Sequence, residues 1–184
     1  ADVPMVADTN LLPEETVNVE IWHYQNGRLH TQQNAELDRD KKKAYVACYH
    51  IDKKRWVPLA NETIPSVFIR SKGNRKWVMG RSYTPYEQLI SWEGFPRTQD
   101  VYSIETSTGN ARKIVSKLKG SVGSSANGDY IYWYNSLDST WYAYSHEKKT
   151  TVALSENIPT SMADERNDVP NVPYQYGIMG WAKG

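Results

Sequence analysis

Short segments in which apolar and polar residues alternate recur along this chain and predict a protein built mainly from β-strands. The clearest pair is residues 128–134 and residues 141–147, which are rich in Tyr and Trp and are separated by a short gap. A second pair, residues 76–82 and residues 100–106, has the same character and a longer gap. Each pair has the pattern expected of two neighbouring antiparallel strands.

Equivalent positions in the two pairs are separated by a constant offset. Tyr102 and Tyr142 lie 40 residues apart, and so do Ile114 and Leu154 in the segments that follow. Repetition at roughly 40 to 50 residues, with about four strands in each unit, is typical of β-propeller blades. The 184 residues have room for about three to four blades, fewer than a full propeller of about six to eight. The sequence therefore predicts an all-β fold, a partial β-propeller of antiparallel four-stranded blades.

Other parts of the chain complete this prediction. Residues 1–16 contain prolines and no periodicity, so they form an irregular lead-in, and residues 17–184 form the partial propeller. One short helix is expected at about residues 30–42. Residues 176–181 have the pattern of a strand that begins a new unit, so we expect the chain to be a fragment of a longer one. A twisted antiparallel sheet or a β-sandwich is the alternative architecture, because alternation does not exclude it.

Charge and hydropathy narrow the classes of partner. The chain has 22 Lys and Arg against 21 Asp and Glu, which disfavours nucleic-acid binding by a broad basic surface. No stretch approaches the roughly 18 apolar residues that span a membrane. The single cysteine, Cys48, has no partner for an internal disulfide and lies in an apolar segment where burial is the default.

The chain contains no recognisable catalytic, cofactor-binding or metal-binding motif. The nearest matches to the nucleophile motif Gly-x-Ser-x-Gly, residues 80–84 and residues 123–127, both lack the second glycine. No glycine-rich loop precedes a helix, as a phosphate site requires. The four histidines have no spacing typical of metal ligands, and we expect structural or surface roles for all of them: His23, His30, His50 and His146.

The segment 83–96 is the strongest candidate for a binding surface. It is a long connection with two prolines, and long connections in compact β domains are often functional. Aromatic and arginine side chains surround it, together with Arg70 and Trp77. We expect those nearest the segment to contact a substrate or a neighbouring domain: Arg81, Tyr83, Tyr86, Trp92 and Arg97. The alternative is ordinary packing of a long loop on the edges of the sheets.

Three groups of residues resemble the bacterial serine peptidases of the prolyl oligopeptidase family, of the dipeptidyl-peptidase or acylaminoacyl-peptidase type. Residues 125–131 are similar to the blade motif Ser-Pro-Asp-Gly-Lys-Tyr-Ile of this family, and residues 100–104 with Thr108 and Gly109 are similar to one of its hairpins. The most specific group is residues 19–24, Leu29, Gln32, Gln33, Arg39 and residues 44–47. The resemblance covers about residues 17–184.

This resemblance implies a function. In the family, an N-terminal propeller covers a C-terminal α/β-hydrolase domain that carries a Ser-Asp-His triad, and the propeller restricts access to short peptides. The chain would then be a non-catalytic propeller segment that gates peptide access and docks onto a hydrolase domain not present in it. The resemblance also implies a periplasmic or secreted location.

Two other functions remain as alternatives. One is a stand-alone propeller-like module that binds protein or glycan through exposed Tyr and Trp. The other is a self-contained hydrolase, which the lack of a triad motif disfavours. An unclosed propeller leaves unpaired strand edges, so we also expect the fragment to pair with another copy through its edges, or otherwise to protect them.

Overall fold

A computed structural model describes residues 23–69 and 74–180, and these residues are mostly β, with 36% strand and 14% helix. The first helix of the described residues is α1 (His30–Lys41), and a hairpin of strands β1 (Ala47–His50) and β2 (Arg55–Pro58) follows it. Two four-stranded antiparallel sheets follow. The first contains β3 (Ser66–Phe68), β4 (Trp77–Ser82), β5 (Thr98–Glu105) and β6 (Ala111–Lys119). The second contains β7 (Val122–Ser124), β8 (Tyr130–Asn135), β9 (Thr140–Ser145) and β10 (Thr150–Ala153).

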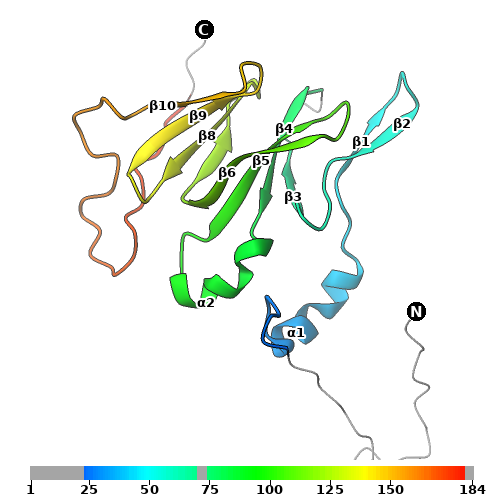
Figure 1. Ribbon diagram of the computed structural model, residues 1–184, viewed down its shortest axis with the longest axis horizontal. Helices are drawn as coiled ribbons and strands as arrows, with labels where there is room; N and C mark the ends of the chain where they lie inside the picture. Colours follow the sequence, from blue (N-terminus) through cyan, green and yellow to red (C-terminus); the bar gives the residue numbers. More distant parts are fainter. Residues whose placement is uncertain (1–22, 70–73, 181–184) are drawn as a thin grey trace, which may run out of the picture.

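In both sheets the strands neighbour one another in the order in which they occur in the sequence. Figure 1 shows the two sheets beside each other, with the β1–β2 hairpin on the far side of the first sheet. The helical segments lie together at one side of the molecule, beyond the ends of the strands (Figure 1). Neither sheet closes on itself. The described fold is therefore three successive antiparallel units.

Two apolar clusters hold these units together, and the first sheet contributes to both. Leu59 and Ile64 pack on one of its faces, against Ile104. On the other face Val101 packs against Ile131 and the rest of the second sheet. Adjacent strand residues point to opposite faces, so strand β5 supplies Ile104 to one cluster and Val101 to the other. Both side chains are fully buried, and each such burial contributes roughly 1.5–3 kcal/mol.

Several sequence predictions are confirmed. The helix expected at residues 30–42 is α1. None of its residues is buried, so this helix does not contribute to the apolar core. The two aromatic pairs form β4 with β5 and β8 with β9, in antiparallel register. The expected strand at residues 17–22 lies outside the described residues.

Three details of the prediction are corrected. The described residues hold two four-stranded sheets and a hairpin, rather than three to four complete blades. The connection 83–96 contains the 3-10 helix η2 (Thr84–Leu89) and the short helix α2 (Ile90–Glu93), so α1 is not the single helix. Its prolines obscured this pattern, although Pro85 stands at the start of η2, where proline is compatible with a helix. The strand expected at residues 176–181 is not formed in residues 176–180. The nearest β-type pairing is the isolated bridge between Ala163 and Gln175.

The turn between the two sheets depends on a glycine. Gly120 lies between β6 and β7, and a Cβ at this position would collide with the backbone carbonyl oxygen of Tyr134. This close approach accompanies two hydrogen bonds, from the Tyr134 amide to the Ser121 carbonyl at 3.0 Å and from the Ser136 amide to the Lys119 carbonyl at 2.9 Å.

We therefore expect Gly120→Ala to lower the free energy of unfolding by about 1–3 kcal/mol, because the backbone must move to admit the methyl group. Urea denaturation monitored by Trp fluorescence measures the effect. Gly177→Ala is the matched control, since a Cβ there meets no atom within 4 Å. Equal stability of the two variants would contradict the close approach.

Candidate functional site

A groove of about 1140 Å³ is lined mainly by the helical segments and the residues next to them. One wall comes from residues 24–43, which include α1, and the other from residues 83–97, which include η2 and α2. Pro65 also lines it. The groove is thus built from two segments distant in the sequence.

Polar contacts hold the two walls together. The side-chain amide of Gln88, in η2, donates to the carbonyl oxygens of Tyr24 at 3.2 Å and Asn26 at 3.3 Å. Neighbouring Glu87 lies against Gly27, so closely that a Cβ on Gly27 would meet its carboxylate at 2.5 Å. The chain at residues 24–27 is therefore fixed against η2.

A cluster of ion pairs joins Arg28, which precedes α1, to the middle and the last turn of that helix. Arg28 donates to Glu36 at 2.6 Å and to Asp40 at 2.7 Å, and Arg39 pairs with Glu36 at 2.7 Å. Hydrogen bonds from Arg28 are the main cause that lowers the pKa of both carboxyl groups, and the pKa of Arg28 is raised in return, first by Asp40 and then by Glu36. Both acids in this cluster thus have cationic partners.

The groove brings together three of the five side chains predicted from the sequence: Tyr83, Trp92 and Arg97. Trp92 is 88% exposed. Arg97 stands over the ring of Phe95, with its guanidinium carbon 5.4 Å from the ring centre. These residues form an accessible aromatic and cationic surface, as expected of a binding site.

The other two predicted side chains lie outside the groove lining. Arg81 is half-buried and stacks on Phe68, at 3.9 Å from the ring centre, and it also lies 5.8 Å from the ring of Tyr83. Tyr86 is buried and points into the protein. Of the two other residues near the segment, Trp77 stacks on His146, and Arg70 lies outside the described residues.

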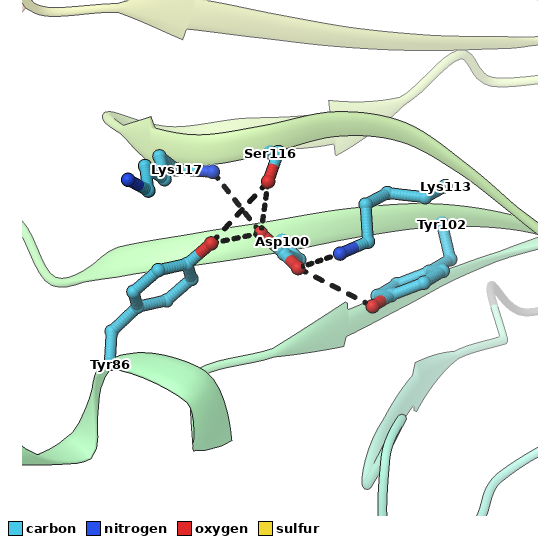
Figure 2. A network of polar contacts seen from close by, with 6 residues as sticks. All are labelled: Tyr86, Asp100, Tyr102, Lys113, Ser116 and Lys117. Atoms are coloured by element: carbon cyan, nitrogen blue, oxygen red, sulfur yellow. Dashed lines mark hydrogen bonds and ion pairs between the residues drawn. The ribbon is translucent and has the colours of Figure 1, made fainter.

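Tyr86 belongs to a network around the buried carboxylate of Asp100 (Figure 2). Its hydroxyl donates to Asp100 Oδ1 at 2.6 Å, and the Lys117 amide and the Ser116 hydroxyl both donate to the same oxygen at 3.1 Å. Lys113 forms an ion pair with Oδ2. The network therefore connects η2 to strands β5 and β6, and it fixes one wall of the groove to the sheet.

Hydrogen bonds stabilise the ionised form of the Asp100 carboxyl group. Burial alone would raise the pKa of this carboxyl, which is only 1% exposed, but the hydrogen bonds from Lys113, Tyr86, the Lys117 amide and Ser116 outweigh burial and lower the pKa. A buried carboxylate with this many donors is a structural anchor.

A second buried polar contact joins the two sheets. The hydroxyl of Ser103, in β5, lies 2.7 Å from Nδ1 of His146, which follows β9, and the imidazole stacks on Trp77 at 5.4 Å. The distance suits a nucleophile and its base. However, Ser103 and His146 are 2% and 3% exposed, so a substrate cannot reach the oxygen. The contact ties the second sheet to the first.

Sequence reasoning did not single out Asp100 or Ser103. Both lie in a strand whose pattern resembles the other strands, and all their partners except Tyr102 are 13 to 43 residues away. The signal that the sequence offered was a polar residue inside a predicted strand. Its meaning depends on which segments pack against it.

Within residues 23–69 and 74–180, no three His, Cys, Asp or Glu side chains gather as a metal site requires. No helix in the same ranges has the length and apolarity needed to cross a membrane. Comparison of the chain with models of known families, with curated proteins and with solved structures gave no match.

We expect Tyr86→Phe to lower the free energy of unfolding by about 1.5–3 kcal/mol, because a buried carboxylate loses a hydrogen bond. Chemical denaturation measures this difference. Tyr83→Phe is the matched control, since the Tyr83 hydroxyl makes no hydrogen bond within the part of the chain that the structure describes. If both variants were as stable as the native protein, Tyr86 would not be an anchor.

The buried imidazole makes stability depend on pH. Burial lowers the pKa of His146 from 6.5 to about 4, although the charge of Asp129 acts in the opposite direction. Between these values the unfolded chain binds a proton that the folded chain does not. The contribution to stability is therefore complete above pH 6.5 and is lost as the pH falls towards 4, by up to about 3 kcal/mol.

Denaturation at several pH values between 4.5 and 7 tests this dependence. His146→Gln should flatten the dependence, in addition to lowering stability at pH 7. His23→Gln, which replaces an exposed histidine, is the matched control. An unaltered slope in His146→Gln would show that other groups cause it.

Proposed function

We propose that this chain is a non-catalytic β-propeller segment of a prolyl oligopeptidase-family serine peptidase. In this proposal it gates the access of peptides to a hydrolase domain that is not part of the chain, and it docks onto that domain. The proposal also gives the protein a periplasmic or secreted location, on the basis of the sequence resemblance. The observation that carries it is a structural repeat.

The 40-residue offset of the sequence relates equivalent positions in the two sheets. Tyr102 lies in β5 and Tyr142 in β9, and each is the third strand of its sheet. Tyr102 faces the unit that precedes its own sheet, and so does Tyr142, which packs against the cluster shared with the first sheet. Sheets that repeat with the same order and the same facing surface are what successive propeller blades require.

One observation favours the second candidate function, a stand-alone module that binds protein or glycan. Tyr49 and Trp56 are cross-strand neighbours in the β1–β2 hairpin, with ring centres 4.8 Å apart. They are 45% and 67% exposed. Exposed aromatic pairs of this kind are common in binding surfaces.

The gene that encodes this chain provides the decisive test. The proposal expects a reading frame that continues into a domain with Gly-x-Ser-x-Gly, then Asp, then His, in the order of an α/β-hydrolase. Sequencing of the transcript shows directly whether the reading frame encodes such a domain. A frame without such a domain would overturn the proposal and favour the binding module.

A fluorophosphonate probe, which labels activated serines, separates the same alternatives in the protein. The probe should label the full-length peptidase and should leave residues 1–184 unlabelled when they are expressed by themselves. Ser103→Ala is the control for the buried serine. Labelling of residues 1–184 that this substitution abolishes would instead indicate a self-contained hydrolase.

A further inference from the structure

The charges that line the groove do not balance. The lining contains five basic side chains and three acidic ones, an excess of two positive charges. Glu36 and Asp40 are already paired with Arg28 and Arg39. The remaining basic side chains are Lys42, Lys43 and Arg97, and the remaining acid is Glu87.

All three remaining basic side chains are exposed and make no ion pair with a residue in the ranges that the structure describes. Two of them lie over aromatic rings, Lys43 over Tyr45 at 5.4 Å and Arg97 over Phe95 at 5.4 Å. A ring beneath a cation orients the charge and leaves its other side for a ligand. The groove therefore offers cations to an acidic partner.

Apolar surface accompanies these charges. Trp92, in α2, and Tyr24, at the opposite wall, line the groove and are among the most exposed aromatic side chains of the described residues. The volume of about 1140 Å³ exceeds the roughly 300–1,000 Å³ typical of small-molecule sites. A groove of this size and open form suits an extended chain better than a compact ligand.

We propose that this groove binds an extended acidic peptide segment. Its carboxylates contact Lys42, Lys43 and Arg97, and its apolar side chains lie against Trp92 and Tyr24. The ion pairs of Arg28 and the contacts of Gln88 hold the walls in position before binding, which lowers the entropic cost of association. The inference does not depend on the peptidase assignment.

Fluorescence anisotropy with labelled octapeptides tests the proposal. The probe alternates glutamate with leucine, and the matched peptide alternates lysine with leucine. The glutamate peptide should bind saturably to the protein, and its affinity should fall several-fold when the salt concentration rises from about 50 to 300 mM, because exposed charges are screened. The lysine peptide should bind at least tenfold more weakly.

Substitutions locate the binding. Arg97→Gln should weaken binding of the glutamate peptide by roughly threefold to fivefold, as expected for one exposed ion pair. Trp92→Ala should weaken it by a similar factor without changing the salt dependence. The matched controls are Lys149→Gln, an exposed cation in the turn between β9 and β10, and Tyr174→Ala, at an exposed aromatic residue outside the groove lining. Neither control should alter the affinity.

Three results would overturn the proposal. These are the absence of saturable binding of the glutamate peptide, equal or tighter binding of the lysine peptide, and equal effects of the groove variants and their controls. All four substituted side chains are exposed, and thermal denaturation verifies that each variant is folded. Lys42→Gln, at an independent position in the same groove, provides a second test if Arg97→Gln alters the fold.

Discussion

The burial of strand β5 on both faces is the constraint on which the rest of the structure depends. Six consecutive residues of this strand, 99–104, are buried. Apolar side chains account for only part of this burial, with Val101 facing the second sheet and Ile104 facing the hairpin. Because Val101 and Ile104 point to opposite faces of β5, the first sheet is the central layer. The hairpin and the second sheet must therefore both present apolar surface to it.

The polar residues of β5 determine how those units are placed. Buried polar groups require partners, and each partner here comes from a different part of the chain. Gln99 donates to the Gly120 carbonyl at 2.9 Å, Asp100 accepts from Tyr86, and Ser103 contacts His146. These contacts fix the inter-sheet turn, the helix η2 and the end of β9 respectively. Apolar packing brings the layers together, and the polar contacts select their alignment.

The proposed binding groove is separated from the sheets that support it. The groove is lined by connections and helices at one side of the molecule, whereas the buried network around Asp100 holds one of its walls to β5 and β6. A rigid β scaffold with binding residues on its connections is a common arrangement. It explains why exposed Trp92 and buried Tyr86, six residues apart, have different roles.

The sequence by itself determined the two aromatic hairpins, α1 and the 40-residue offset, because alternation and turn residues are local properties, whereas the strand it predicted at residues 176–181 is not formed in residues 176–180. It also identified Tyr83, Trp92 and Arg97 as neighbours, since they are close in the chain. Only the tertiary structure decided that residues 24–43 form the opposite wall, that Tyr86 turns inward, and that Asp100 and Ser103 anchor other segments. The physical reason is that these contacts join residues far apart in sequence, and the energy of a buried polar group depends on the partner that the fold brings to it.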